Sequence, residues 1–274
     1  MSHNTKPLKV VAVASGKGGV GKTNVSVNLS VGLARLGREV MLFDADLGLA
    51  NVDVLLGLRP QRTLHDLVTG DVEDLEDVII EGPEGIRVVP SASGIATMAN
   101  LSRPEHHGLI QAFSMYTRPL DVLVVDTAAG LQESVTSFCQ AVQETLVVVT
   151  DEPASMTDAY ALIKVLHRDH GVSRFRVVAN MVQGRAGAER VMQKLQAVCS
   201  TYLPEVILDL VGVIPLDDAL RQAVQKRAPV VQQSPGSPAG RAFLELARKV
   251  DGWPVARGAS GGVGFFVERM LQSA

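Results

Sequence analysis

The sequence predicts an α/β protein built on a doubly wound, mostly parallel sheet with helices on both faces. Short Val-rich runs recur along the chain, and helical periodicity appears between them. Aromatic residues make up only 4% of the 274 residues, so Val, Leu, Ala and Ile must form the core. That composition suits strands that are buried on both faces of a parallel sheet.

Seven runs are predicted to be buried strands, because β-branched residues follow one another between Gly, Pro or Asp. They are residues 9–15, 39–46, 86–92, 121–128, 145–152, 176–180 and 209–215. Amphipathic helices are expected at 24–37, 133–143 and 158–171, and a further helix at about 241–250. Alternating strands and helices indicate βαβ units in one sheet.

The chain is expected to form one domain followed by a tethered tail. Residues 1–253 would be the domain, and 254–264, rich in Gly, Ala and Ser, a flexible linker. Residues 265–274 predict a short amphipathic helix with one apolar face, formed by Phe266, Val267, Met270 and Leu271. Such a helix would lie reversibly in a membrane interface. The alternative is that it docks on its own domain or on a protein partner.

Bulk composition excludes several classes of protein. The net charge of −3 gives no global attraction to nucleic acid or anionic lipid. Two cysteines outside any C-x-x-C indicate neither a disulfide framework nor a metal cage. No signal-peptide core and no run of about 18 apolar residues occurs. A cytoplasmic protein is expected.

Residues 16–23 fit the phosphate-loop pattern G-x-x-x-x-G-K-[ST] between a predicted strand and a predicted helix. Backbone N–H groups of such a loop and the helix N-terminus bind phosphates. Lys22 would bind the β- and γ-phosphates and Thr23 a Mg²⁺ ion. The expected nucleotide contacts are Gly16, Lys17, Gly18, Gly19, Val20, Gly21, Lys22, Thr23 and Asn24.

Lys17 is a second lysine in the same loop. Lys22 and Mg²⁺ already supply the positive charge that the chain's own triphosphate needs. Lys17 is therefore free to serve another ligand, and it could reach the triphosphate of a second copy. The alternative is a solvated loop residue.

Acidic residues end two of the predicted strands. Asp44 and Asp46 follow the second strand, and Asp126 follows four apolar residues, as in a Walker B segment. Carboxylates at this edge of an open sheet can act through Mg²⁺ or polarise a water. Thr23, Asp46 and Asp126 are the expected metal-site residues, and Asp44 a support or simply a turn former.

The stretch "KGGVGKT" resembles the deviant Walker A of the MinD/ParA group, whose signature lysine corresponds to Lys17. The resemblance implies ATP-bound sandwich dimers in which this lysine contacts the partner's nucleotide. "DADLGLAN" is similar to the group's switch I, which implies that Asp46 positions the attacking water. Asn51 and Asp53 would belong to the same switch, and Gly130 in "DTAAG" to switch II. Lys17, Lys22 and Asp46 are therefore the expected catalytic residues.

The same resemblance implies where the base binds. Asn180, Pro215 and Asp217 occupy the positions at which the group holds adenine. Without an N-K-x-D guanine signature, ATP is favoured over GTP.

Within the group, the chain looks most like the FlhG/FleN family of flagellar-number regulators. This implies a homodimerising switch with weak ATPase activity that acts on an enhancer-binding transcription activator and an FlhF-type GTPase. The implied location is the cytoplasm, with reversible association with the inner membrane at the cell pole. The N-terminal D-Q-A-x-x-L-R element of some relatives is absent from "MSHNTKPLK". The alternative is a ParA-type or MinD-type ATPase that positions DNA or the division site. No direct sequence-specific nucleic-acid binding is expected.

Overall fold

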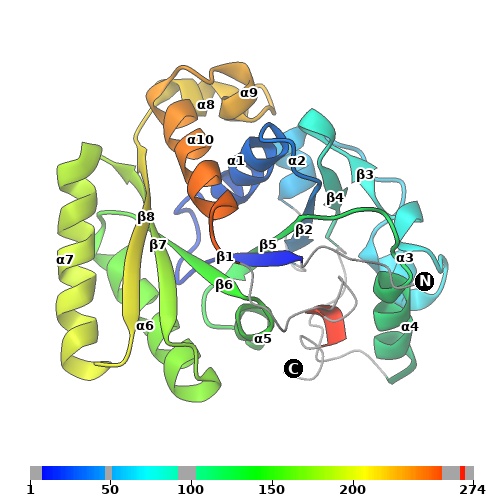
Figure 1. Cartoon of the computed structure of the whole chain (residues 1–274), viewed down its shortest axis with the longest axis horizontal. Coiled ribbons are helices and arrows are strands. Elements are labelled where there is room, and N and C mark those ends of the chain that lie inside the picture. Colours follow the sequence, from blue (N-terminus) through cyan, green and yellow to red (C-terminus); the bar gives the residue numbers. More distant parts are fainter. Residues whose placement is uncertain (1–7, 47–50, 92–102, 255–265, 269–274) are drawn as a thin grey trace.

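The computed structural model describes residues 8–46, 51–91, 103–254 and 266–268. Its centre is an eight-stranded sheet with the order β3-β4-β2-β5-β1-β6-β7-β8. Every neighbouring pair is parallel except β3 and β4, which are antiparallel. Helices lie on both sides of this sheet (Figure 1). The predicted fold class is confirmed.

The strands are β1 Lys9–Ser15, β2 Val40–Ala45, β3 Ile80–Glu81, β4 Arg87–Val89, β5 Val122–Ala129, β6 Glu144–Val149, β7 Arg174–Val182 and β8 Ile207–Pro215. The α-helices are α1 Lys22–Ala34, α2 Val52–Leu56, α3 Leu64–Thr69, α4 Arg103–Ser114, α5 Glu133–Ala141, α6 Pro153–His170, α7 Gly184–Tyr202, α8 Asp218–Gln225, α9 Val230–Gln233 and α10 Pro238–Asp251. Two 3-10 turns, η1 Leu75–Asp77 and η2 Pro83–Gly85, flank β3. All seven predicted strands are present, and β3 was not predicted.

Two apolar cores lie on opposite faces of the sheet. Successive β1 residues alternate between them: Val10 and Ala12 face the core with α3 to α7, whereas Val11 and Val13 face the core with α1, α2 and α8 to α10. This alternation follows from the two-residue period of a strand. It explains why the strands are continuous apolar runs, since both faces are buried.

Helix α1 differs from the expectation of an amphipathic helix. Its residues from Val25 to Leu33 are all buried, including Ser26, Asn28 and Ser30. The physical reason is that the sheet covers one side while α10 packs on another, so close that a Cβ at Gly32 would lie 2.9 Å from the Ala247 side chain. The buried polar side chains bond to backbone carbonyls one turn earlier.

No helix within the described ranges is both long and apolar enough to cross a bilayer. The predicted linker lies outside the described residues except for its first residue, Pro254.

Candidate functional site at the phosphate loop

The phosphate loop joins β1 to α1 at the carboxyl edge of the sheet. Its shape depends on two glycines. A Cβ at Gly16 would lie 2.1 Å from the Asp158 carbonyl oxygen of α6, so the loop touches the α6 backbone there. Gly21 has φ +83°, and a Cβ on it would lie 2.4 Å from Nδ2 of Asn180. Both positions therefore exclude larger residues.

Beyond Gly16, the loop is open to solvent. Gly18 and Gly19 are exposed, and a Cβ on either would meet nothing within 4 Å. Val20 is buried beneath them, and Thr23 and Asn24 are partly exposed in the first turn of α1. A ligand can thus approach the loop backbone at the N-terminus of α1, where helix geometry favours an anion.

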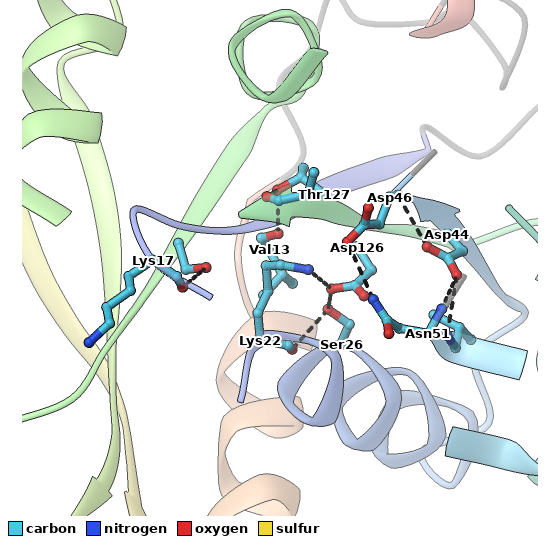
Figure 2. Close-up of polar contacts among 12 residues, drawn as sticks. Val13, Lys17, Lys22, Ser26, Asp44, Asp46, Asn51, Asp126 and Thr127 are labelled. Atoms are coloured by element: carbon cyan, nitrogen blue, oxygen red, sulfur yellow. Dashed lines mark hydrogen bonds and ion pairs between the residues drawn. The ribbon is translucent and has the colours of Figure 1, made fainter. Parts of the chain in front are cut away.

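Lys22, Ser26 and Asp126 form a buried polar cluster beneath this loop (Figure 2). Oδ1 of Asp126 accepts hydrogen bonds from Lys22 Nζ at 2.9 Å and from Ser26 Oγ at 2.7 Å. The second oxygen, Asp126 Oδ2, is buried and has no hydrogen-bond partner among the described residues. A buried carboxylate oxygen without a donor beside a phosphate loop fits the hard-oxygen preference of Mg²⁺.

Asp44 lies on β2, and its side chain binds backbone N–H groups that follow this strand in the sequence. Its carboxylate oxygens accept backbone N–H bonds from Asp46, Asn51 and Val52 at 3.1–3.2 Å. Burial, together with the charge of Asp126, raises the pKa of Asp44 to about 7, while these three N–H donors act in the opposite direction. Asp44 therefore anchors both ends of the segment predicted to be switch I.

Asp46 is partly exposed just beyond the end of β2. Its Oδ2 accepts a hydrogen bond from Asn51 Nδ2 at 3.3 Å, which joins two residues of the predicted switch (Figure 2). Asp53, in the first turn of α2, accepts at Oδ1 a hydrogen bond of 2.7 Å from the N–H of its neighbour Val54. Asp46 thus contacts another residue of the predicted switch, whereas Asp53 contacts its neighbour in the chain. That Asp46 positions a water stays a prediction.

The chain after Asp126 is tied to β1 and to the loop. Thr127 Oγ1 donates to the Val13 carbonyl at 3.1 Å, and the Gly130 N–H donates to the Ser15 carbonyl at 2.9 Å. Gly130 has φ 103°, a conformation that glycine adopts without strain. The predicted switch II therefore contacts the residue that precedes the phosphate loop.

Lys17 points away from the Lys22–Asp126 cluster (Figure 2). Its Nζ lies 3.4 Å from Oε2 of Glu152, and both side chains are substantially exposed. Glu152 is the N-cap residue of α6, but its side chain makes no cap hydrogen bond. Ser155, in the first turn of α6, accepts a hydrogen bond from the Thr150 N–H at 3.0 Å.

The three residues expected at the base lie at the ends of β7 and β8. Asn180 is buried and donates from Nδ2 to the Val20 carbonyl at 2.7 Å, while its Oδ1 has no partner among the described residues. Pro215 ends β8 and is partly exposed. Asp217 caps α8 by accepting from the Ala219 N–H, and it also accepts from the Ala239 N–H. Contact of these residues with a base stays a prediction.

Two members of the predicted tail face, Phe266 and Val267, are buried against the domain. The Phe266 ring stacks on Phe138 of α5, with 6.4 Å between centroids and 25° between planes. For these two residues the structure shows docking on the chain's own domain. Met270 and Leu271 lie outside the described residues.

Sequence reasoning missed the contacts of Ser26 and Glu152. Ser26 follows Lys22 by four residues, so the helical repeat places both on one face of α1, a signal that could have pointed to it. Nothing in the sequence indicated that Glu152 lies beside Lys17.

A sequence model of the ParA family, described as "NUBPL iron-transfer P-loop NTPase", matches residues 6–251. The chain belongs to this family of P-loop NTPases. It is 57% identical to the antiactivator FleN of Pseudomonas aeruginosa over 97% of this chain and 94% of FleN. It is 33% identical to the flagellum site-determining protein YlxH of Helicobacter pylori, over 82% and 75% of the two chains.

Among solved structures, the chain resembles the septum site-determining protein MinD of Pyrococcus horikoshii complexed with Mg-ADP. The TM-score is 0.71 and the identity 28%, over 89% of this chain and 96% of MinD. The predicted MinD/ParA membership is thus confirmed, and with it ATP and Mg²⁺ as the cofactors of the family. The described site has the matching chemistry, with Lys22 and the N-terminus of α1 at the loop and a donor-free Asp126 oxygen below it.

Proposed function

We propose that this protein is an ATP-dependent dimerising switch with slow ATPase activity that regulates the number of flagella. The proposal rests on the 57% sequence identity with FleN over nearly the full length of both chains, and the similarity to YlxH supports it. YlxH is named as a flagellum site-determining protein and FleN as an antiactivator, whereas the MinD relatives are less similar in sequence.

In this proposal the chain binds ATP through its own phosphate loop. Lys22 exchanges the Asp126 carboxylate for phosphate oxygens, and the backbone N–H groups of residues 16–21 bind the rest of the phosphate chain. Thr23, Asp46 and Asp126 would hold Mg²⁺. When bound, Mg²⁺ neutralises the negative charge that develops on the phosphate oxygens.

Hydrolysis then depends on Asp46. Its carboxylate, held by Asn51, orients a water towards the terminal phosphate. No strong general base for the attacking water is evident among the site residues predicted from the sequence, so turnover would be slow and act as a timer.

Lys17 supplies the link to a second copy. The side chain points away from its own site and forms an exposed ion pair with Glu152, which contributes about 1 kcal/mol or less. Such a weak contact is readily exchanged for the partner's triphosphate. Asn180, Pro215 and Asp217 would contact adenine.

The partners proposed for the switch are a second copy, a flagellar transcription activator of the enhancer-binding class and an FlhF-type GTPase. The name antiactivator given to FleN supports the activator. A ParA-type or MinD-type positioning ATPase for DNA or the division site is the alternative, which the MinD relatives favour.

Through the tail, the location of the protein in the cell would depend on which nucleotide is bound. Phe266 packs on α5, which begins three residues after Gly130 of the predicted switch II. A shift of switch II upon ATP binding would loosen this contact and free residues 265–274, joined by linker 254–264, for reversible attachment to the inner membrane. Two tails on one dimer would bind more firmly than one.

Light scattering of the purified protein tests the switch. We expect a monomer with ADP and a dimer with a non-hydrolysable ATP analogue and Mg²⁺. A monomer under both conditions contradicts the switch. Flagella counted by electron microscopy, in a polarly flagellated bacterium that lacks its own FleN-like gene, test the flagellar part. Wild-type protein should restore the normal number, and the Lys22→Ala variant should not.

A further inference from the structure

Ser26 is a fully buried hydroxyl that contacts the predicted metal-site carboxylate. It lies on α1, one helical turn after Lys22, and both side chains reach Oδ1 of Asp126 (Figure 2). Ser26 Oγ also lies 3.2 Å from the Lys22 carbonyl, but the Asp126 oxygen is closer, at 2.7 Å. A hydroxyl favours a charged acceptor over a neutral one, so its proton points to Asp126.

This arrangement gives Asp126 two donors on one oxygen and, among the described residues, none on the other. Lys22 would take part in two interactions. It pairs with Asp126 in the nucleotide-free chain, and it would bind the phosphate chain when a nucleotide is present. If Lys22 were the sole donor, its departure would leave no hydrogen bond to fix the orientation of the Asp126 side chain relative to the ion. Ser26 is not expected to bind phosphate, so it can keep its hydrogen bond to Asp126.

We propose that Ser26 is a positioning residue for the metal site, which holds Oδ1 of Asp126 while Lys22 moves to phosphate and so keeps Oδ2 directed at Mg²⁺. This inference rests on the proposed role of Asp126 in binding the ion. Ser26 itself touches neither the ion nor the nucleotide. Its removal therefore affects the Mg²⁺ requirement and not the affinity for nucleotide alone.

Ser30 offers a matched control on the same helix. Its hydroxyl is equally buried and donates to the Ser26 carbonyl at 2.8 Å, one turn earlier. No hydrogen bond from Ser30 to Asp126 occurs in the described part of the chain. Ser26→Ala and Ser30→Ala thus remove the same atoms from similar surroundings, and alanine is the best helix former. The two variants differ in the contact with Asp126.

The test is calorimetric titration of a non-hydrolysable ATP analogue into the full-length protein at graded Mg²⁺ concentrations and in EDTA. For Ser26→Ala we expect the Mg²⁺ concentration at half-maximal affinity to rise about five- to tenfold, the effect of one charge-assisted hydrogen bond. Affinity in EDTA should stay within about twofold of wild type. Ser30→Ala should match wild type under both conditions.

Two outcomes overturn the inference: an unchanged Mg²⁺ requirement in Ser26→Ala, or an equal loss of affinity with and without Mg²⁺. If Ser26→Ala folds poorly, as judged by its thermal unfolding midpoint, Ser26→Cys replaces it, because a thiol of similar size is a weak donor. Asp126→Asn separates this inference from the proposed function. If that variant keeps the wild-type Mg²⁺ requirement, Asp126 is not the metal residue and the proposed site is wrong.

Discussion

Asp44 and Asp126 are direct partners in the pairing of β2 with β5, and both side chains are fully buried. Two carboxyl groups on adjacent strands disfavour each other's ionised form, because little solvent separates them. Asp126 has a cationic partner in Lys22, whereas within the described part of the chain Asp44 accepts hydrogen bonds from backbone N–H groups alone. Burial raises the pKa of Asp44, and the charge of Asp126 raises it further.

A pH dependence of stability follows from this pair. The pKa of Asp44 rises from 3.8 to about 7 on folding, so between these values the unfolded chain loses a proton that the folded chain keeps. The contribution of Asp44 to the free energy of unfolding should therefore fall as the pH rises from about 4 to about 7, and level off above. Urea unfolding of nucleotide-free protein at several pH values measures it.

The variant Asp44→Asn is the reference for this measurement. Its overall stability should be lower, because an amide nitrogen would face a backbone N–H, but position 44 no longer titrates. The difference between wild type and variant should shrink as the pH rises through this window. A constant difference would show that Asp44 is ionised throughout.

Lys17→Ala should leave nucleotide binding intact and abolish the dimer. The side chain points away from Lys22 and pairs with Glu152 at the surface, so affinity for the ATP analogue should change by about twofold or less. Light scattering should give a monomer with the analogue and Mg²⁺. Glu152→Gln is the control, since it removes the ion pair and keeps the lysine, and it should still dimerise. A Lys17→Ala dimer as stable as wild type would contradict the role in trans.

Asp46→Ala should bind ATP and dimerise but fail to hydrolyse. Removing the group that orients the water should lower phosphate release by about 100-fold or more. The ATP dimer should then persist in light scattering long after the wild-type dimer has decayed. Asp53→Ala is the comparison, because that carboxylate bonds locally to the Val54 N–H. Equal loss of turnover in both variants would assign the effect to the whole switch rather than to Asp46.

Much of the fold was predictable because β-branched runs buried on both faces leave a clear mark in the sequence. The phosphate loop and the acidic strand ends were predictable for a similar reason, because Gly16, Gly21 and Asp126 stand at fixed spacings next to predicted strands. The two-residue strand β3 has too few residues to form a pattern.

The remaining features depend on contacts between distant segments. Ser26, Asn28 and Ser30 made α1 look amphipathic, although bonds to carbonyls one turn earlier allow them to be buried. The contact between Ser26 and Asp126 spans 100 residues, and that between Lys17 and Glu152 spans 135. No local pattern encodes such pairs.

The docked tail yields a prediction with an internal control. Phe113 and Phe138 both pack edge-on against Phe43, but of the two Phe138 alone has a ring contact with Phe266 in the described part of the chain. Phe138→Leu should weaken tail docking and raise co-sedimentation with anionic liposomes in ADP towards the ATP level. The Phe113→Leu variant loses the same atoms from the same core, and in ADP it should stay in the supernatant. Equal sedimentation of both variants would attribute binding to general loosening of the core, and none in either would mean that the tail does not bind membranes.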